Sequence, residues 1–258
     1  MLVDRYDAFL LDLDGVVYRG AEPTPEAAAV LGRLRATGKG LAFVTNNSSR
    51  TPEDVAGHLS SLGVTASPDE VETSALVTAS LLGDRGVATA FVVGELGLVG
   101  ALRERGIETL EGEPDSTDVV VVGLDRSADY AKLRTGSLLV QRGASLVATN
   151  ADASFPAPDG RWPGAGALLA AIETTTGASA EVIGKPNAPI FLAALDRAGG
   201  GRPLVIGDRL DTDIAGAAAV GWDSLLVLTG ISTAREAAGA THRPTHVGDD
   251  LRVLFEDV

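Results

Sequence analysis

Short apolar runs rich in β-branched residues alternate along this chain with longer segments of helical pattern. Strands that alternate with helices in this way are typical of βαβ units, in which parallel strands form a sheet that helices cover. We therefore predict an α/β protein built on parallel sheet. The expected strands are Leu41 to Thr45, Ala90 to Val93, Val119 to Gly123, Ser145 to Thr149, Leu204 to Gly207 and Ser224 to Leu228.

Several short signals mark where helices begin and end. Helix starts are expected at Thr24-Pro25-Glu26, at Thr51-Pro52-Glu53 and at Ser67-Pro68-Asp69-Glu70, where Ser67 and Glu70 have the spacing of a capping box. The cluster Gly199-Gly200-Gly201 predicts a helix end. The glycines of the segment 94–100 do not have the spacing of a dinucleotide-binding fingerprint, and we interpret that segment as a turn.

Composition excludes several classes of function. The 258 residues carry a formal net charge of −14, which disfavours nucleic acid or an anionic membrane as the main partner. The chain has no cysteine, and its three histidines are scattered, so neither disulfides nor a zinc-thiolate site is expected. Because the first seven residues contain acids and no apolar run approaches the ~18 residues of a membrane span, we expect a cytoplasmic protein.

Two carboxylates, Asp12 and Asp14, follow the apolar run Ala8 to Leu11 and precede Gly15. Like charges about 4 Å apart repel by roughly 4 kcal/mol at an effective dielectric constant of 20, so such a pair needs a cation or a shared proton. In an extended segment the two side chains point the same way, and Gly15 lets the backbone bend closely around a ligand. The alternative is a strand end followed by an ordinary Asp-Gly turn.

Polar residues follow two other predicted strands. Thr45-Asn46-Asn47-Ser48-Ser49-Arg50 could bind an anion, or could be a turn stabilised by its own hydrogen bonds. Asp208 follows the strand that ends at Gly207, and Asp211 and Asp213 come next, where acids also favour a helix start. With Asp12 and Asp14, Asp208 would complete an all-oxygen site suited to Mg²⁺.

Lys185 is one of only three lysines among 21 basic residues, and it stands between Gly184 and Pro186. A buried ammonium there could pair with Asp12 and balance the charge of a phosphate. The alternative is a surface lysine before a helix start.

Asp12-Leu13-Asp14-Gly15, Thr45-Asn46-Asn47, Lys185 and the segment Gly207 to Asp213 occur in the order of the four motifs of the haloacid dehalogenase superfamily, which this chain strongly resembles. The residues of these motifs are most similar to those of the NagD-type branch, which includes actinobacterial glycerol-3-phosphate and phosphoglycolate phosphatases. The resemblance implies a Rossmann-like core with a parallel sheet, formed by residues 1–76 and 181–258. Because the interval between the second and third motifs is too long for a connection, residues 77–180 would be an inserted α/β cap of the C2 type.

The resemblance also implies a role for each motif residue. Asp12 would be the nucleophile that forms an aspartyl-phosphate, and Asp14 the general acid and base. Mg²⁺ would be bound by Asp12, the backbone carbonyl of Asp14 and Asp208, while Asp213 would lie behind these direct ligands. Thr45, Asn46 and Lys185 would bind the transferring phosphoryl group.

The cap is expected to select the substrate, a small phosphorylated metabolite. Phe155, Arg161 and Trp162 are candidates for contacts with the leaving group, unless their loop only packs its aromatic rings under the cap. Glycerol 3-phosphate or phosphoglycolate is favoured, while a nucleotide, a sugar phosphate, pyridoxal phosphate or a phosphotransferase reaction with the same Asp12 stays open. By analogy with the branch we also expect a homodimer formed through the cap.

Overall fold

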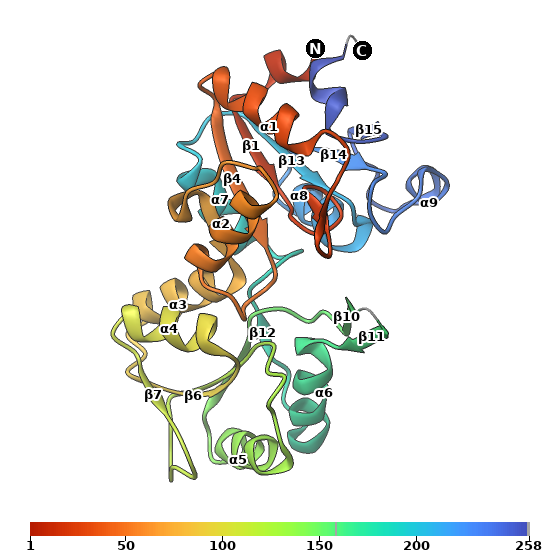
Figure 1. Cartoon of the computed structure of the whole chain (residues 1–258). Coiled ribbons are helices and arrows are strands. Elements are labelled where there is room, and N and C mark those ends of the chain that lie inside the picture. Colours follow the sequence, from red (N-terminus) through yellow and green to blue (C-terminus); the bar gives the residue numbers. More distant parts are fainter. Residues whose placement is uncertain (158, 257–258) are drawn as a thin grey trace. The chain divides into compact units, whose positions relative to one another are not determined.

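The computed structural model describes residues 1–157 and 159–256, which divide into two compact units (Figure 1). The core unit contains residues 1–45, 52–72 and the described residues from 185 onward, and the cap unit contains 46–51 and the described residues of 73–184. The short segment 46–51, which we predict as part of the core, is thus grouped with the cap unit. The predicted borders at 76/77 and 180/181 stay a prediction.

The core unit is built on one sheet with the strand order β15-β14-β13-β1-β4-β5. The pairs β14–β15, β13–β14, β1–β13 and β1–β4 are parallel, which confirms the predicted parallel α/β architecture. The strands are β1 (Ala8–Leu11), β4 (Gly40–Thr45), β5 (Val71–Thr73), β13 (Pro203–Gly207), β14 (Asp223–Val227) and β15 (His246–Gly248).

Helices cover both faces of this sheet because its central strands are apolar on both sides. Phe9 and Leu11 of β1 pack in one cluster with Leu31 of α1 (Ala27–Ala36) and Leu59 of α2 (Pro52–Ser61). Burial of one such side chain contributes about 1.5–3 kcal/mol. The helices α7 (Ala188–Arg197) and α8 (Ala215–Ala219) contact β1, β4 and β14, and Phe191 of α7 packs against the backbone of Gly216 of α8.

The order of the strands makes the carboxyl ends of β1 and β13 the natural place for a site. From β1 the chain first adds β4 and β5 on one side, and later returns to add β13, β14 and β15 on the other side. In open α/β sheets, ligands bind in the crevice outside the carboxyl ends of the strands at such a reversal. The residues that follow β1 and β13 directly are Asp12 and Asp208.

The cap unit has its own sheet, with the order β12-β9-β8-β6-β7 and parallel pairs throughout. Figure 1 shows α5 and α6 on one side of this sheet and α3 and α4 on the other. A separate antiparallel hairpin is formed by β10 (Ser154–Ala157) and β11 (Gly160–Pro163). The remaining elements of the unit are β6 (Thr89–Val93), β7 (Glu108–Leu110), β8 (Val119–Val122), β9 (Ser145–Ala148), β12 (Glu181–Val182), α3 (Ser74–Asp84), α4 (Leu96–Glu104), α5 (Tyr130–Gln141) and α6 (Ala165–Thr176).

Two local predictions were wrong. The capping box of Ser67 and Glu70 forms, but it caps only the short 3-10 turn η2 (Pro68–Glu70), because Val71 continues as strand β5. The segment 94–100 is a turn only at its beginning, since α4 starts at Leu96. The buried residues Leu98, Ala101 and Leu102 follow the helical spacing of three and four, and this spacing outweighs the glycines.

Short elements complete the core unit. They are η1 (Leu2–Arg5), β2 (Tyr18–Arg19), β3 (Glu22–Pro23), η3 (Leu210–Ile214), α9 (Ala234–Gly239) and η4 (Leu251–Phe255).

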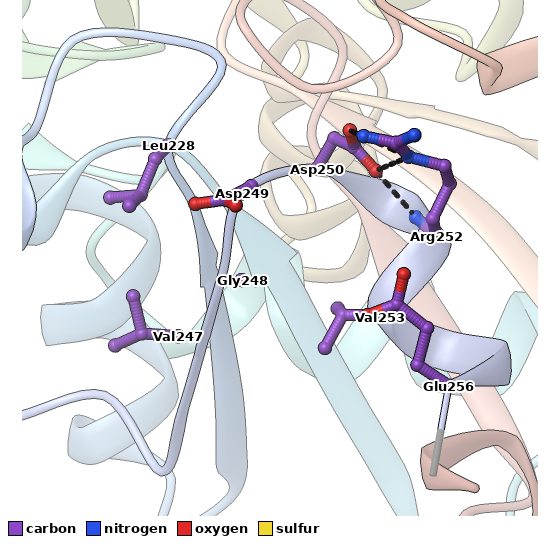
Figure 2. Close-up of a pocket in the computed structure, with 8 residues that line it drawn as sticks. All are labelled: Leu228, Val247, Gly248, Asp249, Asp250, Arg252, Val253 and Glu256. Atoms are coloured by element: carbon purple, nitrogen blue, oxygen red, sulfur yellow. Dashed lines mark hydrogen bonds and ion pairs between the residues drawn. The ribbon is translucent and has the colours of Figure 1, made fainter. Parts of the chain in front are cut away.

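A hollow of about 280 Å³ opens beside β15 and η4, where the carboxylate of Asp250 pairs with Arg252 (Figure 2). The residues that line this hollow include none of the predicted site residues. Among the described residues, no helix combines the length and the apolar character that crossing a bilayer requires.

Candidate active site

Parallel pairing of β1 with β13 brings two predicted site residues together. Leu11 is in register with Ile206, and the backbone N–H of Asp12 donates to the Ile206 carbonyl at 2.8 Å. Asp12 and Asp208 therefore follow neighbouring strands directly, at the same edge of the sheet. Each offers a carboxylate oxygen that lies within 4.8 Å of the other and of a carboxylate oxygen of Asp213.

Asp213 reaches this cluster from η3, a single π-helical turn directly after β13. Such turns are rare in proteins, and those that occur are often found at functional sites. The N–H of Arg209 donates to Asp213 Oδ2 at 3.2 Å, which fixes the carboxylate beside the strand end. A side chain at Gly207 would place its Cβ 2.1 Å from the Cβ of Asp213, so the close approach of this turn to β13 requires glycine.

Lys185 provides the positive charge at the centre of the cluster. Its Nζ donates to Asp12 Oδ1 at 2.5 Å, to Asp213 Oδ1 at 2.7 Å and to the Val44 carbonyl at 3.3 Å. The Lys185 side chain is only 4 % exposed, so these contacts replace its hydration almost completely. Of the two alternatives for this lysine, the structure favours the buried partner of Asp12 over the surface residue.

The electrostatics of the cluster show a shortage of positive charge. Burial raises the pKa of Asp208 to about 6, and the neighbouring Asp213 adds to this increase. Burial also raises the pKa of Asp12 well above its ordinary value, although Lys185 opposes the change. Burial alone would lower the pKa of Lys185, but Asp12 and Asp213 together raise it above its ordinary value. Three carboxylates and one ammonium thus favour an additional cation.

One oxygen atom in the cluster is suited to bind that cation. Asp208 is 2 % exposed, its Oδ2 accepts a hydrogen bond from the N–H of Ile231 at 2.7 Å, and its Oδ1 is buried with no hydrogen-bond partner among the described residues. A buried carboxylate oxygen without a donor is costly unless it coordinates a metal. The donor set consists of oxygen atoms only, which fits Mg²⁺.

The other residues of the core motifs differ in exposure and in the unit to which they belong. Asp14 is exposed, and its carboxylate does not belong to the cluster of Asp12, Asp208 and Asp213. Thr45 is the buried last residue of β4. Asn46 belongs to the cap unit, where its Nδ2 donates to Asp152 Oδ2 at 3.0 Å.

Asn46 is also held through its backbone. Its carbonyl accepts hydrogen bonds from Asn150 Nδ2 at 2.8 Å and from Ser74 Oγ at 2.7 Å. The next serine of the segment, Ser48, accepts from Thr149 Oγ1 at 3.1 Å. These contacts explain why the segment 46–51 is grouped with the cap unit.

The three candidates for leaving-group contacts lie on the β10–β11 hairpin. Phe155 is paired with Trp162 across the strands, and their rings meet edge to face with centroids 6.1 Å apart. Trp162 is 43 % exposed, its Nε1 donates to Asp159 Oδ1 at 2.7 Å, and Arg161 is exposed too. The hairpin presents Trp162 and Arg161 to solvent, and their contact with a substrate stays a prediction.

Sequence reasoning missed one part of the site, the loop that follows β14. Ile231 donates to Asp208, and Thr229 Oγ1 donates to the Gly15 carbonyl at 2.5 Å. A signal was present, because the polar residues of this loop follow a predicted strand at the same edge of the sheet as Asp12 and Asp208.

A Rossmann-like core that gathers three carboxylates and a buried lysine at its strand reversal fits a phosphoryl-transfer enzyme of the α/β class. Residues 9–108 match the haloacid dehalogenase-like hydrolases, and residues 182–254 match a second group described as HAD-hydrolase-like. A D-glycerol 3-phosphate phosphatase of Mycobacterium tuberculosis is 39% identical over 260 residues, which cover 99% of this chain and 73% of the relative. The chain belongs to the haloacid dehalogenase-like hydrolase family.

Solved structures agree with this assignment. The crystal structure of glycerol phosphate phosphatase from Mycobacterium tuberculosis in complex with magnesium has a TM-score of 0.94 at 39% identity, covering 98% of this chain and 77% of that one. NagD from Escherichia coli has a TM-score of 0.88 at 30% identity, covering 95% and 96%. The predicted resemblance to the NagD type is thereby confirmed, and the magnesium complex of the relative supports the predicted cofactor.

Proposed function

We propose that this chain is a Mg²⁺-dependent phosphatase that hydrolyses a small phosphomonoester through an aspartyl-phosphate on Asp12. The observation that carries the proposal is the position of the Asp12 carboxylate. It accepts a 2.5 Å hydrogen bond from buried Lys185, and it lies beside Asp208, whose Oδ1 has no donor among the described residues. A carboxylate that is oriented by one cation and adjacent to a second cation site is suited to approach an anionic phosphate.

In the first step a carboxylate oxygen of Asp12 attacks the phosphorus atom. The bond from phosphorus to the Asp12 oxygen forms, and the bond from phosphorus to the leaving oxygen breaks. Asp14 donates its proton to the leaving oxygen, which departs as an alcohol. The exposed position of Asp14 leaves its carboxyl group able to exchange protons with solvent.

In the second step water releases the phosphate. Asp14, now a carboxylate, takes a proton from the water as the water oxygen attacks phosphorus, and the bond from phosphorus to Asp12 breaks. Inorganic phosphate leaves, and both aspartates return to their starting protonation states. The two steps replace one slow displacement by two faster ones.

Phosphate binding would involve Lys185, Thr45 and Asn46. Lys185 would hold a phosphoryl oxygen, and Thr45 and Asn46, which are consecutive in the chain, would donate from a hydroxyl and an N–H. Mg²⁺, when bound by Asp12, the Asp14 carbonyl and Asp208, reduces the repulsion between the phosphate and the Asp12 carboxylate. Asp213 would lie behind the direct ligands of Mg²⁺ and orient Lys185, since its Oδ1 accepts a hydrogen bond from Lys185 Nζ at 2.7 Å.

For the substrate we favour glycerol 3-phosphate, because the relative from Mycobacterium tuberculosis named as a D-glycerol 3-phosphate phosphatase is matched along 99% of this chain. A sugar phosphate is the second candidate. An acid sugar phosphatase of Staphylococcus aureus is 38% identical over 257 residues, covering 98% of both chains. Phe155, Arg161 and Trp162 would select between such leaving groups.

The experiment compares phosphate release from a panel of phosphomonoesters. The panel holds glycerol 3-phosphate, phosphoglycolate, sugar phosphates, nucleotides, pyridoxal phosphate and a generic aryl phosphate, each with Mg²⁺ and again with a chelator. We expect a higher kcat/KM for glycerol 3-phosphate than for the aryl phosphate, and loss of all turnover with chelator. Turnover that persists in Asp12→Asn or with chelator would reject the mechanism, and transfer of phosphate to an added alcohol rather than to water would show a phosphotransferase.

Three further expectations belong to this proposal. They are a cytoplasmic location, a homodimer formed through the cap, and a cap domain bounded at residues 77 and 180. Light scattering on the purified protein distinguishes the dimer from a monomer. A molecular mass near that of a single 26.3 kDa chain would contradict the dimer.

A further inference from the structure

The loop that follows β14 joins two segments of the acid cluster that are distant in the sequence. Thr229 is 9 % exposed, and its Oγ1 donates to the carbonyl of Gly15, which lies 214 positions earlier in the chain. The 2.5 Å distance makes this a short hydrogen bond to the loop that carries Asp12 and Asp14. Gly15 N–H in turn donates to the Tyr18 carbonyl at 2.7 Å, so the Gly15 peptide is held from both sides.

The same loop also fixes Asp208. The N–H of Ile231 donates to Asp208 Oδ2 at 2.7 Å, and the N–H of Ser232 donates to the Asp208 carbonyl at 3.0 Å. The Oγ of Ser232 accepts from the N–H of Leu210 at 3.1 Å, which ties the loop to the start of η3. One Asp208 oxygen is thus occupied by a backbone donor, while the other, Oδ1, has no donor among the described residues.

Two glycines form the walls against which the Asp208 carboxylate lies. A Cβ on Gly230 would be 1.9 Å from Asp208 Oδ2, and a Cβ on Gly15 would be 2.5 Å from the same atom. Both distances are shorter than any allowed contact, so only bare backbone fits on either side. The carboxylate has no room to rotate toward these two peptides, and its Oδ1 keeps one direction.

We propose that Thr229 is a positioning residue of the cation site, acting through the loop 229–232. Its hydroxyl fixes the Gly15 peptide at the end of the nucleophile loop, and the following residues hold Asp208 with Oδ1 directed to the cation. The inference rests on the proposed Mg²⁺ site and adds a residue that is neither a ligand nor a phosphate-binding group. Its physical basis is preorganisation, since ligands already held in place lose less freedom when the ion binds.

The test measures Mg²⁺ binding directly, by titration calorimetry without substrate. Thr229→Val keeps the shape of the side chain but removes the donor, and leaves the Gly15 carbonyl unsatisfied. We expect Mg²⁺ to bind about tenfold more weakly to Thr229→Val, and Thr229→Ser, which restores the hydroxyl, to bind as the wild-type protein does.

A matched control separates positioning from general stability. Thr78 is fully buried in α3, and its Oγ1 donates to the Ser74 carbonyl at 2.7 Å. Thr78→Val should lower the melting temperature and leave the dissociation constant for Mg²⁺ unchanged. Equal Mg²⁺ affinity in Thr229→Val and wild type, or equal weakening in Thr229→Val and Thr229→Ser, would overturn the inference.

If Thr229→Val shows no cooperative unfolding, Gly230→Ala decides the question. Its methyl group would displace the Asp208 carboxylate, so we expect Mg²⁺ binding to weaken at least tenfold, whereas unchanged affinity would overturn the inference. Failure of the proposed function has a different signature. A wild-type protein that binds Mg²⁺ but hydrolyses no phosphomonoester would contradict the phosphatase activity. The calorimetry would still decide the role of Thr229 in Mg²⁺ binding.

Discussion

The Nζ of Lys185 lies 2.5 Å from Oδ1 of Asp12, although 173 positions separate the two residues in the chain. The contact is possible because Asp12 follows the central strand β1 and Lys185 is brought back to the same edge of the sheet ahead of α7. It orients the carboxylate that we propose as the nucleophile. It also places a fixed positive charge where the charge of a phosphate would have to be balanced.

Lys185→Met should destabilise the protein, because it leaves the buried carboxylates of Asp12 and Asp213 without their partner. Removal of one member of a buried ion pair costs about 3–5 kcal/mol. The measurement is urea unfolding in the presence of chelator. Lys39→Met is the control, since the Nζ of the half-buried Lys39 donates to a backbone carbonyl, that of Tyr6, instead of to carboxylates. Equal stability of the two variants would contradict the assigned role of Lys185.

Gly207→Ala should disturb the acid cluster directly. The added Cβ would lie 2.1 Å from the Cβ of Asp213, so η3 or β13 must shift, at a cost of about 1–3 kcal/mol and with a loss of aryl phosphatase activity. Gly100→Ala is the control, because that helical glycine faces open space in α4 and alanine favours a helix by about 1 kcal/mol. A Gly207→Ala variant as active and stable as Gly100→Ala would show that the turn is tolerant.

Trp162→Ala should change substrate choice more than chemistry. The ring is exposed on the β10–β11 hairpin and lies outside the acid cluster, so we expect KM for glycerol 3-phosphate to rise while kcat changes little. A loss of about 1–3 kcal/mol of binding corresponds to a 10- to 200-fold rise at most. Leu192→Ala, which removes another exposed apolar side chain, is the control. An equal effect on all substrates, or none, would contradict a role of the hairpin in selection.

His246 should make the stability of the core depend on pH. Its Nε2 lies 2.8 Å from Tyr6 Oη, at the edge of the sheet where β15 begins. Burial lowers the pKa of His246, Arg5 and Arg202 lower it further, and Asp223 opposes them. The unfolded chain therefore takes up a proton on His246 at a higher pH than the folded chain does. The free energy of unfolding decreases as the pH falls through the ordinary pKa of histidine toward the lower pKa of the folded state.

The measurement for this prediction is the difference in melting temperature between pH 7.5 and pH 5.5. His246→Gln should lose less stability over this interval than the wild-type protein. His242→Gln serves as control because His242 is exposed. If both variants show the same pH dependence, His246 does not contribute to it.

Most strands of the two parallel sheets could be predicted from the sequence, because these strands are uniform apolar runs. Val119–Val122 and Ala8–Leu11 are buried at every position, and such runs have one stable place, inside a sheet covered on both faces. The helix expected after Ser67 failed for the opposite reason. Its local capping signal was correct, but the place of Val71–Thr73 beside β4 in the sheet depends on tertiary contacts that no local window contains.

The acid cluster was predictable in its membership but not in its geometry. Asp12, Asp208, Asp213 and Lys185 could be found because each follows or precedes a recognisable element at one edge of the sheet. The equal direction expected for Asp12 and Asp14 requires an extended segment, whereas β1 ends at Leu11 and Gly15 already turns with φ +81°; a common direction of the two side chains stays a prediction. The contact of Thr229 with Gly15 was beyond sequence reasoning, since a hydroxyl and a carbonyl 214 positions apart leave no local pattern.

Chemical trapping of the phosphorylated enzyme tests the central claim most directly. The protein is mixed with an aryl phosphate and Mg²⁺ and quenched in acid. Borohydride then reduces any acyl-phosphate to an alcohol, so that an aspartate becomes homoserine, which mass spectrometry can locate. We expect the modification at Asp12 in the wild-type protein and none in Asp12→Asn. Modification at another residue, or rapid turnover with no trapped intermediate at Asp12, would contradict the mechanism.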